Sequence, residues 1–166
     1  MAKSLMLAII SILVGCGSTP DKPQAPYVHV IMLDKSPFLE EYVEGPSAWA
    51  PLGFEVSADD SGMEECGDSW YKFGMLDCQI TIGIQTNPLL REKEGTDAKS
   101  DRYTRIITLD PEVMDHYPLL ISVAHEAGHI LLDTPKHTQG GIMGGATWWM
   151  KQVDKDLACE SIRICI

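Results

Sequence analysis

Positive charge is scarce in this chain, which has 13 lysine and arginine residues against 24 aspartate and glutamate residues and a net charge of −11. An acidic surface repels phosphate backbones, so no nucleic-acid partner is expected. Long apolar runs are also missing, since the run from Leu5 to Val14 is too short to cross a bilayer as a permanent anchor. The 166 residues, 45% of them hydrophobic, suit one ordinary domain with a packed core.

The N-terminus has the pattern of an export signal. Lys3 gives a positive start, and the apolar run from Leu5 to Val14 follows it. The run ends in Leu13-Val14-Gly15-Cys16, which resembles the lipobox of bacterial lipoproteins, whose cysteine is lipidated and becomes the first mature residue. The alternative is an ordinary secretory signal with a chance cysteine. The expected organisation is a lipoprotein signal peptide (1–15), a flexible tether (16–26) and one domain (27–166), held at the membrane of the cell envelope by a lipid on Cys16.

Four cysteines remain in the expected domain: Cys66, Cys78, Cys159 and Cys165. An even number in an exported chain favours two disulfides, and three connectivities are open. A Cys66–Cys78 bridge is favoured because a glycine-containing loop lies between the two residues. Six residues along a continuous helix rise about 9 Å, so Cys159 and Cys165 form a pair only if the helix ends before Cys165. No Cys-x-x-Cys pair is present, which argues against a cysteine metal site.

The pattern of apolar residues predicts an α+β fold with a mixed sheet. Strands are expected at 27–33, 54–57, 78–86 and 105–109. Residues 87–103 are polar and are interpreted as a long excursion with no strong strand signal. Ser36 and Pro37 predict a helix start before Phe38. Further helices are expected at 117–132, ended by Pro135, and at 147–162, with Val153 among the core contacts of the last one.

The helix at 117–132 contains the motif His125-Glu126-Ala127-Gly128-His129. Histidines at i and i+4 lie on one face of a helix, so both ring nitrogens can bind one zinc ion at about 2.0–2.1 Å. Glu126 follows the first histidine, a position from which its carboxylate can take a proton from a water molecule at the metal without binding the metal itself. The motif therefore predicts one catalytic Zn²⁺, with Glu126 as general base.

Together with the downstream segment Gly141-Ile142-Met143-Gly144, this motif resembles the metzincin zinc peptidases. That family has H-E-x-x-H-x-x-G-x-x-H and, downstream, a methionine turn beneath the metal, a role that falls here to Met143. The resemblance implies a twisted mixed sheet packed on an active-site helix and an N-terminal helix, with a C-terminal helix after the methionine turn. It also implies an extended peptide substrate along an edge strand.

The third metal ligand is where the chain departs from the family pattern. Leu132 stands at the family's glycine and Pro135 at its third histidine, and His137 is the nearest histidine. The methionine turn favours His137, while Asp133 and Glu160 remain alternatives. The expected function is that of a zinc metalloendopeptidase acting on peptide or protein substrates. The alternatives are a zinc-binding envelope lipoprotein without peptidase activity and a cell-wall amide hydrolase.

Overall fold

The computed structural model describes residues 25–74, 76–110 and 115–166, and in these residues five strands form one mixed sheet of order β2-β1-β3-β5-β4. Strand β1 (Tyr27–Met32) pairs in parallel with β2 (Glu55–Ser57) and β3 (Gln79–Thr86), and β3 pairs in parallel with β5 (Ile106–Leu109). Strand β4 (Ala98–Asp101) is an antiparallel edge strand beside β5. The α+β class and the four predicted strands are therefore confirmed, whereas Cys16 and the rest of the expected signal lie outside the described residues.

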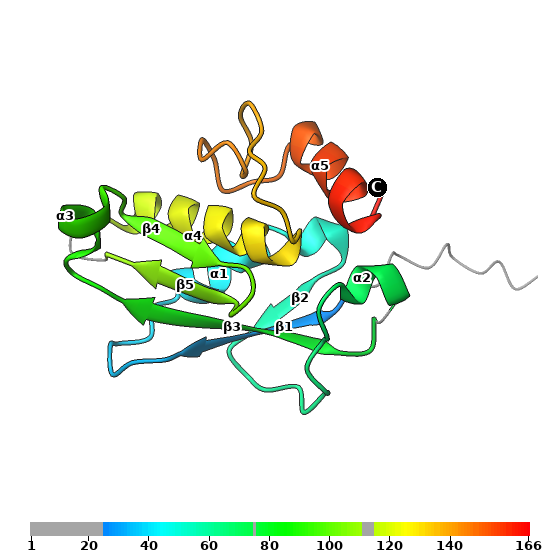
Figure 1. Cartoon of the computed structure of the whole chain (residues 1–166), viewed down its shortest axis with the longest axis horizontal. Coiled ribbons are helices and arrows are strands. Elements are labelled where there is room, and N and C mark those ends of the chain that lie inside the picture. Colours follow the sequence, from blue (N-terminus) through cyan, green and yellow to red (C-terminus); the bar gives the residue numbers. More distant parts are fainter. Residues whose placement is uncertain (1–24, 75, 111–114) are drawn as a thin grey trace, which may run out of the picture.

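Two helices cover one face of this sheet, α1 (Glu41–Ser47) and α4 (His116–Leu131), as Figure 1 shows. The two helices pack closely because Gly45 has no side chain, and a Cβ there would lie 2.8 Å from Val123. A short 3₁₀ helix (Ala50–Leu52) follows α1, and just before it Trp49 is fully buried and donates a hydrogen bond to the Ala124 carbonyl at 2.9 Å. The core between the sheet and the helices includes Val28, Val30, Ile80, Ile82, Ile84, Ile107, Leu109, Val123, Ala127 and Leu131.

The predicted helix start at Ser36 is wrong, because Ser36 belongs to the turn after β1. Its N–H donates to Asp34, and its hydroxyl lies 2.8 Å from that of Thr86. The backbone N–H groups of Thr86 and Ser36 lower the pKa of Asp34 to about 2. These bonds fix the chain in a turn, and α1 begins only at Glu41.

The interpretation of 87–103 as an excursion without a strand is also wrong in part. The segment contains the short helix α3 (Leu90–Glu94) and the edge strand β4. The sequence Ala-Lys-Ser-Asp has little intrinsic preference for a strand, so β4 owes its conformation to pairing with β5.

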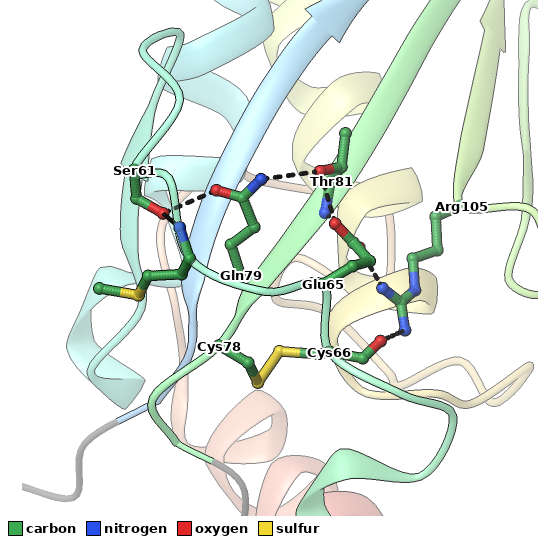
Figure 2. The surroundings of a disulfide bond; sticks show 8 residues. Ser61, Glu65, Cys66, Cys78, Gln79, Thr81 and Arg105 are labelled. Carbon is green, nitrogen blue, oxygen red and sulfur yellow. Dashed lines mark hydrogen bonds and ion pairs between the residues drawn. A yellow bond between two sulfur atoms is a disulfide. The ribbon is translucent and has the colours of Figure 1, made fainter.

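The Cys66–Cys78 disulfide closes the loop that contains the short helix α2 (Trp70–Phe73) and ends just before β3 (Figure 2). Just before this loop, Glu65 accepts hydrogen bonds from the backbone N–H and the hydroxyl of Thr81, and Arg105 donates to the Cys66 carbonyl at 2.7 Å and forms an ion pair with Glu65 (Figure 2). The predicted Cys66–Cys78 pair is thus confirmed.

The last helix, α5, runs over Gln152–Ile162 rather than from residue 147. Thr147 prevents an earlier start, because its hydroxyl accepts a hydrogen bond from the Trp149 N–H and donates one to the Trp149 carbonyl. After Ile162 the chain reverses at Arg163 (φ 63°), which brings Cys165 to Cys159 as a second disulfide. The expectation that Val153 lies in the core is wrong, since it is 37% exposed and its neighbour Asp154 is fully buried.

Candidate metal centre

Three histidines converge at the C-terminal half of α4. His125 and His129 come from consecutive turns of the helix, and His137 comes from the segment that follows it. One ligand atom from each residue lies within 4.8 Å of the other two. The ring centroids are 4.8 Å apart for His125 and His129, 5.1 Å for His125 and His137, and 4.8 Å for His129 and His137. A group of this kind could hold a metal ion.

Backbone carbonyls orient the two helical histidines. The Nδ1 atom of His125 lies 2.9 Å from the Ile142 carbonyl oxygen, and that of His129 lies 2.7 Å from the Thr134 carbonyl oxygen. Since a carbonyl only accepts hydrogen bonds, Nδ1 carries the proton in both rings, and each Nε2 lone pair is left for a ligand. Burial lowers the pKa of the His129 imidazole, against the opposing effect of its bond to Thr134. The neutral form favoured in this way is the form that binds metals.

The segment that follows α4 brings His137 close to His125 and His129. The helix ends at Leu131, and Asp133 takes a left-handed conformation (φ 44°) that turns the chain back before Pro135. Beyond His137, Thr138 donates its N–H to the Met143 carbonyl at 3.3 Å and its hydroxyl to the Gly140 carbonyl at 2.6 Å. The longer turn that replaces the glycine of the family pattern therefore still brings a histidine to the site.

Neither of the alternative ligands lies in the histidine group of the described residues. The carboxylate of Asp133 accepts a hydrogen bond from the Tyr71 hydroxyl at 3.1 Å and pairs with Arg102 at 3.4 Å. Glu160, on α5, pairs with Lys136. Of the three candidates for the third position, the structure brings only His137 to the helical pair.

Met143 is fully buried against the middle of the motif. A Cβ on Gly128 would lie 2.4 Å from the Met143 sulfur and 2.5 Å from the Trp49 ring. Glycine is therefore required at the fourth motif position, because the methionine turn and Trp49 occupy the space of a side chain there. The resemblance to the metzincins had indicated Met143, but not the reason for Gly128.

A buried carboxylate that sequence reasoning missed holds the methionine turn. Asp154 is fully buried and accepts hydrogen bonds from the N–H groups of Ile142 (3.1 Å), Met143 (3.1 Å) and Lys151 (2.8 Å). Gly141 makes room for it, since a Cβ there would lie 2.3 Å from the carboxylate. The Met143 N–H and the Ile142 carbonyl that accepts from His125 belong to one peptide unit, so Asp154 holds the peptide that orients this candidate ligand. The sequence signal was weak, because an acid in the first turn of a helix is ordinary on a surface.

Glu126 faces an open cleft of about 370 Å³ beside the histidines. The cleft is lined by Thr96, Ala98, Lys99, Ser100, Arg102, His125, Glu126, His129, Pro135 and His137. Strand β4 supplies one wall, and its Ser100 hydroxyl donates a hydrogen bond to Glu126 Oε2 at 2.6 Å. A carboxylate, three histidines and an edge strand thus meet in one accessible place.

The two remaining histidines lie elsewhere: His29 is on β1, and His116, at the start of α4, pairs with Glu41. Comparison of the chain with models of protein families, with characterised proteins and with solved structures gives no match, so no relative bears on function. In the part of the chain that is described, no helix has the length and apolar character needed to span a membrane.

Proposed function

We propose that the protein is a zinc-dependent metalloendopeptidase in which His125, His129 and His137 bind the metal and Glu126 is the general base. The observation that carries this proposal is the meeting of three histidines with the carboxylate of Glu126 in a cleft along an open sheet edge. Catalytic zinc sites take three protein ligands and keep a further position for water or substrate, and three histidines suit that arrangement.

The donor set fits zinc in charge and spacing. Neutral imidazole nitrogens bind zinc at about 2.0–2.1 Å, which places tetrahedral ligands roughly 3.4 Å apart. The three ligand atoms here lie within 4.8 Å of one another, so the rings would move closer together on binding the ion. A bound zinc ion would supply Lewis acidity, lowering the pKa of a water molecule and polarising the peptide carbonyl.

Glu126 provides the proton transfer. It follows His125 on the same helix and stays outside the histidine group, so its carboxylate is available to the attacking water. It takes a proton from that water and later gives it to the leaving amine. The Ser100 hydroxyl occupies Oε2 and leaves Oε1 for the proton.

Strand β4 is the proposed binding edge for an extended peptide. It pairs with β5 on one side and ends the order of the described sheet on the other, so its outer edge could pair with a substrate strand once the Ala98 carbonyl gives up its hydrogen bond from the Thr96 hydroxyl. Main-chain hydrogen bonds of this kind supply affinity without demanding one sequence. The cleft runs along this strand and includes the histidines, which would place a peptide bond of the bound strand beside Glu126.

The metzincin-like assignment is part of the proposal. It is supported by the burial of Met143 against the motif helix, by the position of His137 and by the order of sheet, active-site helix, methionine turn and final helix. The proposed location in the cell envelope rests on the Leu13–Cys16 motif, and two disulfides agree with an oxidising compartment. Replacement of Cys16 by alanine should release the protein from the membrane fraction, and unchanged membrane association would contradict lipid anchoring at Cys16.

The test is hydrolysis of a peptide library by the wild type with zinc, with a chelator, and by Glu126→Gln. Glu126→Gln should keep zinc and lose roughly 10²–10⁴ in rate, since it removes the base but no ligand. Glu160→Gln, which alters an exposed carboxylate on α5, is the matched control and should cleave like the wild type. Wild-type rates in Glu126→Gln would refute the peptidase mechanism. Cleavage of cell-wall amides alone, or of no substrate at all, would favour one of the two alternative functions.

A further inference from the structure

Strand β4 is joined to the motif helix by alternate side chains. Ala98, Ser100 and Arg102 are partly buried, while Lys99 and Asp101 between them are exposed, which is the period of two expected for a strand with one face on α4. Ser100 donates to Glu126, and Arg102 donates to the Asp133 carbonyl at 3.2 Å. The edge strand is therefore linked to both the acid in the motif and the turn that precedes His137.

The Ser100 bond constrains the side chain on which the proposed chemistry depends. A glutamate has three rotatable side-chain bonds, and Glu126 is only partly buried, so packing alone leaves it several rotamers. A hydrogen bond from a hydroxyl to one carboxylate oxygen selects among them, and at 2.6 Å it has the length of a charge-assisted bond. The hydroxyl thus holds Glu126 by one oxygen and leaves the other outside this bond.

The strand that carries Ser100 is also the strand that a peptide would pair with. β4 is only four residues long and is paired on one side, through Ala98↔Leu109 to Asp101↔Ile106. Short edge strands with one partner are among the less stable parts of a sheet. A peptide pairing along the outer edge gives β4 a second partner and so fixes the position of Ser100.

We propose that Ser100 is a positioning residue that couples peptide pairing along β4 to the orientation of Glu126. This inference rests on the proposed peptidase function and adds a substrate requirement to it. Peptides long enough to pair along the whole strand gain turnover as well as affinity, because pairing orders the residue that orients the base. Short peptides reach the histidines but leave β4, and with it Glu126, less ordered.

The kinetic test compares an octapeptide cleaved by the wild type with a blocked dipeptide that contains the same scissile bond. In the wild type, kcat should be much higher for the octapeptide. Ser100→Ala should lower kcat on the octapeptide roughly 10- to 100-fold, with KM changed less than about 2-fold, because main-chain pairing does not need the hydroxyl. The ratio of the two kcat values should fall toward one. Ser100→Thr should restore most of the turnover, because it keeps the hydroxyl on a residue that suits a strand.

Ser122→Ala is the matched control, since it removes a hydroxyl from α4, the helix that carries Glu126, but outside the cleft lining. It should retain wild-type kcat values on both peptides. If Ser100→Ala keeps the wild-type ratio of kcat values, or changes KM alone, the coupling is refuted while the peptidase function stands. Absence of any hydrolysis by the zinc-loaded wild type would instead overturn the proposed function and the coupling with it.

A second readout does not depend on activity. The side-chain carboxyl ¹³C resonance of Glu126, assigned by its loss in Glu126→Gln, reports the hydrogen bond in the metal-free protein. It should move in Ser100→Ala, stay close to the wild-type position in Ser100→Thr and not move in Ser122→Ala. An unchanged resonance in Ser100→Ala would overturn the role of Ser100 whether or not peptides are cleaved.

Discussion

Asp154→Asn is the substitution that most sharply tests how the metal centre is held. The carboxylate accepts three backbone hydrogen bonds: Oδ1 from Met143, and Oδ2 from Ile142 and Lys151. An amide has the same shape but offers one oxygen and two donor hydrogens. Whichever way it turns, at least one buried backbone N–H then faces another donor.

The cost follows from these contacts. A buried donor left without an acceptor costs about 1–3 kcal/mol, and the remaining bonds lose the charge assistance of the carboxylate. We therefore expect the free energy of unfolding to fall by about 2–4 kcal/mol. For a chain of this size such a loss lowers Tm by about 5–15 °C. Zinc affinity should fall by about 10-fold or more, because the Ile142 peptide that Asp154 holds also orients His125.

Thermal unfolding and zinc titration of the variant measure both effects. Asp156→Asn is the control, because Asp156 lies on the same helix, is exposed and accepts a hydrogen bond from the side chain of Gln152. Its unfolding free energy should stay within about 0.5 kcal/mol of the wild type. A wild-type Tm for Asp154→Asn would refute the energetic argument. A large fall in Tm with unchanged zinc affinity would show that the turn is structural and does not position His125.

Three further predictions follow from other parts of the molecule. His137→Ala should weaken zinc binding far more than Asp133→Ala or Glu160→Ala. Loss of zinc binding in Glu160→Ala alone would instead show that a glutamate, and not His137, is the third ligand. The free energy of unfolding of the Cys66→Ser/Cys78→Ser double variant, measured with denaturant, should be lower by about 3 kcal/mol, because the bridge closes a loop of sequence separation 12. A loss near zero would mean that the bonds of Glu65 and Arg105 suffice to hold the loop. Glu41 raises the pKa of His116 through their hydrogen bond, while the pKa of Glu41 is lowered first by its own backbone N–H and then by His116. The contribution of the pair to stability is therefore present between the two pKa values and is lost as pH rises through that of His116. His116→Ala should therefore lower Tm at pH 5.5 but not at pH 9, and an equal effect at both pH values would contradict the ion pair.

The parts of the site that were predictable from sequence are those set by spacing along one element. The motif fixes the shared face of His125 and His129 by helical geometry, and alternating apolar residues predict β1 and β3. His137 was favoured only through the resemblance to a family, since the turn that delivers it depends on the left-handed Asp133 and its bonds to Tyr71 and Arg102.

What sequence could not show depends on partners distant in the chain. β4 is a strand because β5 pairs with it, and Ser100 acquires a role only when that pairing brings it to Glu126. Asp154 looks like a surface acid until the methionine turn folds over it. The buried residues of α5 follow helical spacing and are Asp154, Leu157, Ala158 and Ile162. The first of them is charged, so the apolar pattern of the sequence pointed to its neighbour Val153, which is exposed.

The most direct measurement of the central claim is a zinc titration of the metal-free protein, followed by bound metal and by peptide hydrolysis in the same samples. The account predicts that hydrolysis rises in proportion to bound zinc and levels off at one ion per chain, with the three histidines as ligands. One tightly bound zinc with no hydrolysis of any library peptide would contradict the account and leave a zinc-binding protein without peptidase activity.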